Sequence, residues 1–316
     1  MALDAFKTIS NYLYKNHYES QQIDNGATSS HWKNLCAHMT VSTDKNIFLK
    51  QFGFGNFKTK SFINNIKYFA EILLSNYLLY KHNCPPNIRS ASRHIANNQN
   101  RIYEFDCAKH ALSLNFILNS LAGHNSNSTF SDHRINTICI IGDGYGFMGN
   151  LIKYFENNIK IISINLGKTL LFDVHYTEQL FPNASVELMQ SKPNSSTLNA
   201  DFTFIEAQNY EFISELNIDL FINIASMQEM NNDIINNYFK YMNTSKAVKQ
   251  TFYCCNRTKK KLPDGEVTQI NSYPWENHEI LINEPCPWYQ QYPSHRPPFW
   301  KPFDGEIRHI IAKITR

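Results

Sequence analysis

Short strands made only of apolar residues alternate with helical segments from about residue 131 onward, and this alternation constrains the fold more than any other feature. The clearest strand candidates are residues 137–141, 159–164 and 219–224. A strand without polar positions is typical of a parallel sheet that helices cover on both faces. Further candidates follow at residues 186–189, 202–205, 247–255 and 307–314. The pattern predicts a doubly wound, Rossmann-like α/β domain with a mainly parallel sheet of seven strands.

The first 130 residues carry helical patterns instead of this alternation. Apolar residues recur at helical spacing over residues 62–77 and again over residues 105–122. A chain of 316 residues can hold a catalytic domain and a smaller helical part. We therefore expect a helical cap that contributes to the substrate region at residues 1–130, and a catalytic domain at residues 131–316.

Composition and charge bear on the class of protein. Thirty basic and 27 acidic residues leave a net charge of +3, which offers no electrostatic case for nucleic acid or an anionic membrane as partner. No run of about 18 apolar residues indicates a membrane span, and the N-terminus lacks the apolar core of a signal peptide. The seven cysteines form no C-x-x-C pair, so we expect a cytoplasmic protein with reduced thiols and no metal site.

A glycine-rich turn directly follows the first strand candidate and opens a helix. Its sequence is Gly142-Asp143-Gly144-Tyr145-Gly146, and another glycine stands three positions later. Glycines in such a turn allow a tight bend and let a ligand approach the backbone closely. Ligands of open α/β sheets bind at the carboxyl ends of the strands, where the strand order reverses. The turn is therefore the expected cofactor site.

Two cofactors compete for this turn. Spacing from Gly142 matches the loop that faces the amino-acid part of S-adenosylmethionine, whereas Gly144 to Gly149 also satisfies the dinucleotide fingerprint. The first glycine of a dinucleotide loop lies at the end of its strand, and in this chain Gly142 has that position. This frame favours S-adenosylmethionine, as does the helical region ahead of the sheet, because dinucleotide domains often begin with that strand.

Residues after the neighbouring strands are expected to complete the cofactor site. The end of the second strand usually carries an acid for the ribose hydroxyls, and this chain has Asn165 and Leu166 there. An amide can still bond a hydroxyl, without charge assistance. The usual acid just before the turn is replaced by Ile140. The remaining candidates are Glu206, Ala207 and Gln208 beside the adenine amine, and Asn223 at the end of another strand.

Three segments with distinctive motifs follow one another along the chain. They are residues 140–146, residues 221–230 with Ser-Met-Gln-Glu-Met, and residues 252–257 followed by Leu-Pro-Asp-Gly and Tyr-Pro-Trp. In this order they resemble the sugar O-methyltransferases of bacterial surface-polysaccharide gene clusters. The resemblance covers about residue 100 to the C-terminus, and reaches the N-terminal third chiefly at Ser30-His31-Trp32. It implies a class I methyltransferase that uses S-adenosylmethionine to methylate a sugar hydroxyl in capsule or O-antigen biosynthesis.

Methyl transfer to oxygen requires an acceptor hydroxyl aligned behind the methyl group and a base for its proton. Glu229, just past the fourth strand, is the first candidate base, although the same position suits an acid that caps a helix start. His175 and His278 are alternative bases, each also interpreted as a packing or surface residue. Ser226 and Gln228 are candidates for orienting the acceptor.

A segment rich in proline and aromatic residues, at about 285–300, is a candidate substrate lid. Trp288 and Arg296 are its candidate sugar-binding side chains, while a rigid loop packed on the N-terminal part is an equally good interpretation. The expected partner is a sugar or glycan acceptor. The oligomeric state stays open, with a homodimer as one option.

Two other classes of protein stay open. An NAD-dependent nucleotide-sugar oxidoreductase or epimerase would use the dinucleotide frame, but Tyr238 and Met242 replace the usual Tyr-x-x-x-Lys pair. A non-catalytic, methyltransferase-like binding module would account for Ile140 and Asn165 in the places of the usual acids. Binding of NAD or of S-adenosylhomocysteine distinguishes these classes.

Overall fold

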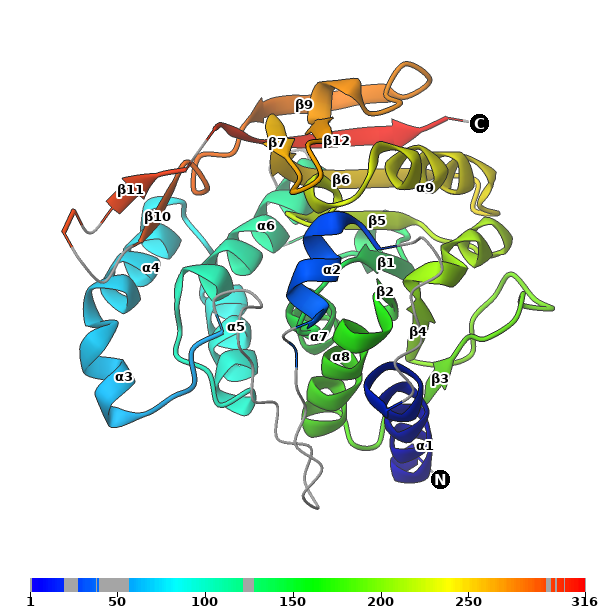
Figure 1. Ribbon diagram of the computed structural model, residues 1–316, viewed down its shortest axis with the longest axis horizontal. Helices are drawn as coiled ribbons and strands as arrows, with labels where there is room; N and C mark the ends of the chain where they lie inside the picture. The colour runs from blue at the N-terminus through cyan, green and yellow to red at the C-terminus, as the bar shows by residue number, and fades with distance from the viewer. Residues whose placement is uncertain are drawn as a thin grey trace.

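One eight-stranded sheet forms the centre of the molecule (Figure 1). The structure, a computed structural model, describes residues 2–19, 28–37, 39, 57–121, 128–293, 297–298, 300–303 and 305–315. In spatial order the strands are β3 (Val186–Leu188), β4 (Phe202–Glu206), β2 (Lys160–Asn165), β1 (Thr137–Ile141), β5 (Leu220–Ile224), β6 (Gln250–Arg257), β12 (Ile307–Ile314) and β9 (Glu279–Pro285). Neighbours from β3 to β6 pair in parallel, whereas β12 is antiparallel to both β6 and β9.

The doubly wound, mainly parallel sheet predicted from the sequence is confirmed, with one strand more than expected. The additional strand is β9, at the edge of the sheet, and nearly all of its residues are exposed. Its only apolar run is Ile280-Leu281-Ile282, which is shorter than the four to eight residues that indicate a strand, so the sequence pattern does not reveal it. Two small hairpins lie outside the sheet: β7 (Lys259–Lys261) with β8 (Val267–Gln269), and β10 (Gln291–Pro293) with β11 (Trp300–Pro302).

Helices cover both faces of the sheet. Alternate residues of β1 point to opposite faces, so Ile138 and Ile140 belong to one apolar core while Cys139 and Ile141 belong to the other. The first core packs against α1 (Ala2–Tyr14), α4 (Phe69–Lys81), α5 (Pro86–Asn98), α6 (Phe105–Leu121), α7 (Phe147–Phe155) and α8 (Gly167–Leu180). The second packs against η3 (Ala207–Glu215) and α9 (Asn232–Thr244). The N-terminal helices therefore share a core with the sheet.

The predicted helix over residues 62–77 is present, but it is broken and faces outward. It divides at Tyr68 into α3 (Phe62–Lys67) and α4. The apolar residues that keep helical spacing are exposed, and the inner side of α4 instead carries Glu71, Ser75, Leu78 and Leu79. Spacing alone shows that a helix forms, but it does not show which side is buried.

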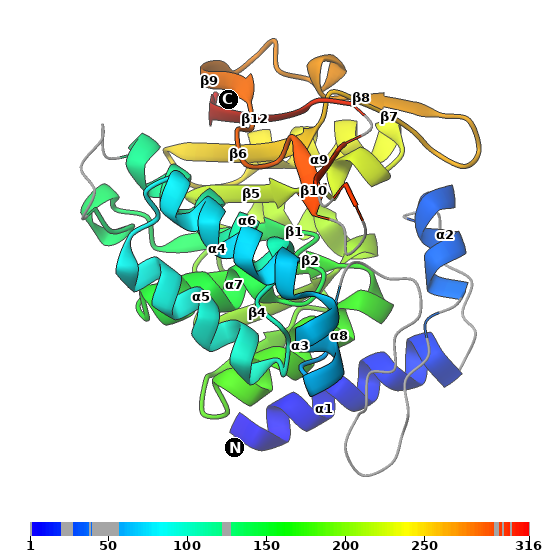
Figure 2. The same ribbon diagram turned by 90° about the vertical axis from the view of Figure 1, so that its left-hand side faces the viewer.

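The N-terminal segment reaches the carboxyl edge of the sheet. Helix α1 packs on α8 and β3 and continues into η1 (Lys15–Glu19). Helix α2 (Ser30–Ala37) lies outside the carboxyl ends of the central strands, as the two perpendicular views show (Figures 1 and 2). The short helices η2 (Ser131–His133), η4 (Met227–Glu229) and η5 (Ile270–Ser272) complete the described elements. Among these elements, no helix has both the length and the apolar character needed to cross a membrane.

Candidate functional site

The glycine-rich turn joins β1 to α7 at the carboxyl edge of the sheet. Gly142, Gly144 and Gly146 have φ angles of 76°, 80° and 64°, in the left-handed region that disfavours other residues. A Cβ atom on Gly142 would overlap the Oγ atom of Ser226. The turn after β1 and the turn after β5 thus touch directly, and a side chain at position 142 would separate them.

Asp143 caps α7 from within the turn. Its carboxylate accepts hydrogen bonds from the backbone N–H groups of Met148, at 2.9 Å, and Gly149, at 2.7 Å. Amides at a helix start are the groups that hold the pyrophosphate in a dinucleotide site. Because a carboxylate of the chain already occupies them and would repel a phosphate, this helix start is poorly suited to a dinucleotide.

A second carboxyl group lies behind the turn, on α8. Asp173 is buried and accepts hydrogen bonds from Ser163 Oγ, at 2.6 Å, and Asn165 Nδ2, at 3.2 Å. Burial, followed by repulsion from Asp143, raises the pKa of Asp173 above its ordinary value. The Oδ1 atom of Asn165 accepts a further bond from Thr169 Oγ1. The amide expected to meet the ribose is therefore already hydrogen-bonded within the fold.

A cavity of about 30 Å³ lies at this edge, between the turn and the N-terminal segment. The residues expected from the sequence that meet there are Gly142, Asn165, Leu166, Ala207 and Ser226. The other lining residues are Ser29, Trp32, Ile164, Met230, Ile234 and Tyr238. A space of this size holds water, whereas a nucleoside needs several hundred Å³.

Sequence reasoning did not assign the second set of lining residues to the site. The last three look like the apolar face of α9 and the turn before it, and spacing cannot separate a core position from a cavity wall. The only signal for Trp32 is its place in the N-terminal motif of the resemblance.

Side chains of η1 and α2 fill the space around this cavity. The imidazole of His17 bonds the buried carboxylate of Glu206 at the end of β4. A Cβ atom on Gly167 would overlap the ring of His17, so the ring rests directly on the start of α8. Tyr18 donates from its hydroxyl to the carbonyl oxygen of Lys168, at 3.0 Å. The N-terminal segment thus occupies the mouth formed by β2 and β4.

Glu229, the first candidate base, lies at the end of η4 between the side chains of Lys260 and His31. Its Oε1 atom is 2.7 Å from Lys260 Nζ and 3.4 Å from His31 Nε2. Burial opposes ionisation, but the hydrogen bond with His31 and the charge of Lys260 hold the pKa of Glu229 below its ordinary value. A carboxylate stabilised in this way is a weak proton acceptor. It is well placed to orient His31, which sequence reasoning did not single out as a base.

Asn223 and Gln228 were expected to face a ligand, but their side-chain amides bond the backbone of the turns around the site. Asn223 donates to the carbonyl oxygen of Ile141, at 2.8 Å, and accepts from the backbone N–H of Met227, at 3.0 Å. Gln228 accepts from the backbone N–H of Arg257, at 2.8 Å. Neither Asn223 nor Gln228 is among the residues that line the cavity.

Neither of the alternative bases lines the cavity. His175 is midway along α8, with its Nε2 atom 3.0 Å from the side-chain amide of Gln179. His278 directly precedes Glu279, whose partner Lys313 also pairs with Thr251 near the start of β6. The amino ends of the parallel strands lie there, so His278 is at the opposite edge of the sheet from Gly142.

The remaining candidates are dispersed. Tyr145 is buried with its ring 4.8 Å from that of Phe57, and Gln208 is exposed at the start of η3. Trp288 is buried against Phe116, with ring centroids 5.8 Å apart, so it is part of the core and not of a lid. Arg296 lies outside the described residues. Within the described ranges, no group of three or more His, Cys, Asp or Glu side chains could hold a metal ion.

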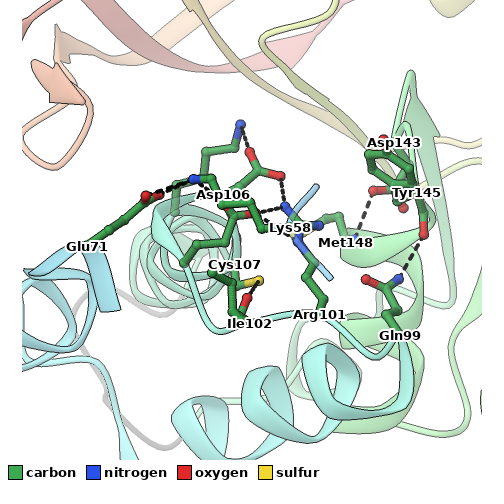
Figure 3. Close-up of polar contacts among 12 residues, drawn as sticks. Lys58, Glu71, Gln99, Arg101, Ile102, Asp106, Cys107, Asp143, Tyr145 and Met148 are labelled. Carbon is green, nitrogen blue, oxygen red and sulfur yellow. Dashed lines mark hydrogen bonds and ion pairs between the residues drawn. The ribbon is translucent and has the colours of Figure 1, made fainter. Parts of the chain in front are cut away.

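A network of buried and half-buried charges lies behind the glycine-rich turn (Figure 3). Arg101 is buried and bonds both Glu104 and Asp106, while its guanidinium group lies 5.7 Å from the ring of Tyr145. Lys58 bonds Glu104, at 3.1 Å, and Glu71 of α4, at 2.6 Å, and Lys109 bonds Asp106, at 2.5 Å. The network thus connects α4 to the turn. No local sequence motif predicts this network, because its members are spread over some fifty positions of the chain.

Comparisons with known proteins give structural likenesses only. The chain matches no family model, and no curated protein matches it in sequence. It resembles the mitomycin 7-O-methyltransferase, with 8% identity and a TM-score of 0.39, over 66% of this chain and 57% of that one. It also resembles magnesium protoporphyrin IX methyltransferase from Synechocystis PCC 6803 with bound S-adenosylhomocysteine, with 10% identity and a TM-score of 0.38, over 67% of this chain and 88% of that one. A third similar structure is M. capricolum TrmK with S-adenosylhomocysteine, with 16% identity and a TM-score of 0.36, over 64% of this chain and 69% of that one.

The class of fold follows from the order of the strands. This chain spans little more than half the length of the mitomycin enzyme, and likenesses this remote carry no argument about substrate. The sheet has β1 at its centre, parallel neighbours on both sides, and the antiparallel β12 inserted between β6 and β9. This is a doubly wound, Rossmann-like arrangement with an antiparallel strand inserted near one edge.

Proposed function

We propose that this chain is an S-adenosylmethionine-dependent O-methyltransferase whose acceptor is a sugar hydroxyl. The observation that carries the proposal is the turn between β1 and α7. Its first left-handed glycine, Gly142, lines a cavity at the carboxyl edge, while Asp143 occupies the start of α7. That arrangement accepts the methionyl end of a methyl donor and disfavours a pyrophosphate. The fold supports the same class.

The donor set around the turn suits this cofactor. Gly142 and Ser226 would hold the amino-acid part, Leu166 the ribose, and Glu206 with Ala207 the adenine amine. S-adenosylmethionine supplies an electrophilic methyl group on a sulfonium centre when it is bound. The present cavity is too small for it, so the η1 side chains that fill the mouth must move to admit it, while α2 stays in place. The hydrogen bonds of His17 and Tyr18 there are few enough to allow this.

His31 is the proton acceptor in this proposal, and Glu229 is the residue that positions it. An imidazole is the commonest base in proton transfer, and a carboxylate partner orients the ring and stabilises the imidazolium that forms. Lys260 keeps Glu229 ionised through its own ion pair. Trp32, which follows His31 in α2 and lines the cavity, offers an aromatic face on which a sugar ring can stack.

Calorimetry tests the cofactor class directly. The full chain is titrated with S-adenosylhomocysteine and, separately, with NAD. We expect binding of S-adenosylhomocysteine and none of NAD. Binding of NAD alone would assign the chain to the oxidoreductases, and the absence of binding by either at millimolar concentration would assign it to the non-catalytic modules.

Formation of S-adenosylhomocysteine with a panel of sugars and nucleotide sugars tests the acceptor and the base. We expect His31→Asn to lower kcat by roughly 10²- to 10⁴-fold, the usual contribution of a general base. Glu229→Gln should lower kcat less, because the imidazole keeps a hydrogen-bonding partner but loses a charged one. His175→Asn, at a residue that does not line the cavity, is the matched control. Full turnover by His31→Asn on a true acceptor would remove His31 from the mechanism.

A further inference from the structure

The outer face of α3 and α4 is a continuous apolar stripe. Every one of its side chains is between 52% and 80% exposed. The members of this stripe are Phe62, Ile63, Ile66, Phe69, Leu73, Tyr77 and Tyr80. Among the described residues, no other element exposes more than two large apolar side chains. A contiguous exposed patch of this kind marks a surface that binds another protein or a membrane.

The stripe faces outward because the inner side of α4 is anchored. Glu71 is 4% exposed and accepts hydrogen bonds from Lys58 Nζ at 2.6 and 2.7 Å. Lys58 is held in turn by Glu104, at 3.1 Å. Rotating α4 to bury Phe69 and Leu73 would pull Glu71 out of this network. The exposure is therefore a fixed property of the fold, and Figures 1 and 2 show α3 and α4 on the flank of the molecule.

The surroundings of the stripe are strongly cationic. Residues 57–103 contain seven Lys and Arg residues but a single acid, Glu71, which is buried. Lys58 and Arg101 are paired with Glu104 inside the fold, which leaves five basic residues outside that network. Lys60, Lys67 and Lys81 are exposed, and the guanidinium group of Arg89 lies 4.3 Å from the ring of Tyr80. The rest of the chain carries 23 basic and 26 acidic residues. The small net charge of the whole chain thus conceals a basic region with an apolar centre.

We propose that this face binds the surface of an anionic lipid bilayer, with the stripe inserted among the headgroups and the lysines against the lipid phosphates. Aromatic and branched apolar residues bordered by lysine are typical of helices that lie in the membrane interface. A second copy of this chain is a poorer occupant. A two-fold contact places the same surface on both sides, which would bring two cationic rims together without acidic partners from this face. This inference goes beyond the proposed function and does not depend on it.

Sedimentation with vesicles tests the proposal on the full chain. We expect binding to vesicles of phosphatidylglycerol and phosphatidylcholine in equal amounts to be at least about tenfold tighter than to phosphatidylcholine alone, and to weaken with salt. The combined change Phe69→Ser, Leu73→Ser and Tyr77→Ser should reduce binding about tenfold or more. Val248→Ser removes a 93% exposed apolar side chain elsewhere and should leave binding unchanged.

A charge variant separates the two contributions. Lys67→Gln combined with Lys81→Gln should weaken binding to the anionic vesicles and reduce its salt dependence. Circular dichroism and thermal melts confirm that each variant is folded, as expected for changes at exposed positions.

The proposal fails if the wild-type chain binds neither kind of vesicle, or if the triple serine variant binds as tightly as the wild type. It also fails if light scattering shows a dimer that the triple variant dissociates while vesicles are not bound, because the stripe would then join two copies. No cofactor is present in this assay, so its failure leaves the methyltransferase proposal standing, and the reverse also holds.

Discussion

Helices α7 and α4 are both short and apolar, yet they face opposite ways. Helix α7 buries Met148 and Leu151 against the sheet, whereas α4 exposes Phe69 and Leu73. Each helix is fixed by a carboxylate: Asp143 bonds the first amides of α7, and Glu71 bonds Lys58 beneath α4. The comparison teaches that apolar spacing predicts a helix, while the polar groups that anchor it decide which side is buried.

The largest expected difference between the two helices is in the cost of removing a leucine. Leu151→Ala leaves a cavity in a packed core and should lower the free energy of unfolding by about 2–5 kcal/mol. Leu73→Ala, on the exposed face of α4, should change it by less than about 0.5 kcal/mol. Urea unfolding of both variants measures this. Equal losses would mean that the stripe is covered in solution, most simply by a second copy of the chain.

The anchor of α4 can be tested next. Glu71→Gln removes the charge from a buried pair with Lys58 and should lower the free energy of unfolding by about 1–3 kcal/mol. Glu279→Gln, in an exposed pair with Lys313, is the control and should cost less than about 1 kcal/mol. If the two variants unfold alike in urea, the anchor does not explain why α4 turns its apolar side outward.

The smallest expected effect concerns the carboxyl group behind the anchor of α7. A raised pKa means that folded Asp173 holds its proton more tightly than unfolded Asp173. The free energy of unfolding should therefore fall as the pH rises above the ordinary aspartate pKa of about 3.9 toward the raised value. Asp173→Asn should flatten this slope and stabilise the fold at neutral pH.

Thermal melts between about pH 4 and pH 9 measure the slope. The control is Asp233→Asn, on the exposed start of α9, which should keep the wild-type slope. A steeper decline in Asp173→Asn than in the wild type would show that the ionised carboxylate stabilises the fold, contrary to the direction that its raised pKa implies.

Much of the sheet is predictable because its strands are buried on both faces. The bounds of β1 and β12 coincide with the expected 137–141 and 307–314. Strand β9 was missed because its apolar run, residues 280–282, is too short to indicate a strand and neither alternates nor lies in the core. The outward face of α4 was equally beyond prediction, since it depends on an ion pair between positions 58 and 71 and on what that pair contacts.

The candidate site was predictable only where backbone geometry dictates the residue. Gly142 is required by its φ angle and its contact with Ser226, and this requirement is visible as a motif. Contacts made by the N-terminal segment, such as that of His17 with Glu206, join positions 189 residues apart and leave no local trace. Amides at strand ends, such as Asn223, can serve a ligand or a neighbouring turn with the same atoms, so the sequence cannot choose between them.

The hydrogen bonds of Asp143 also affect which surrounding molecules can bind at the start of α7. Helix starts with free amides collect inorganic phosphate and nucleotides from their surroundings. At α7 the chain has filled that place with its own carboxylate. Because these amides are already bonded, we expect the turn not to bind phosphorylated sugars or nucleotides even when their concentration is high.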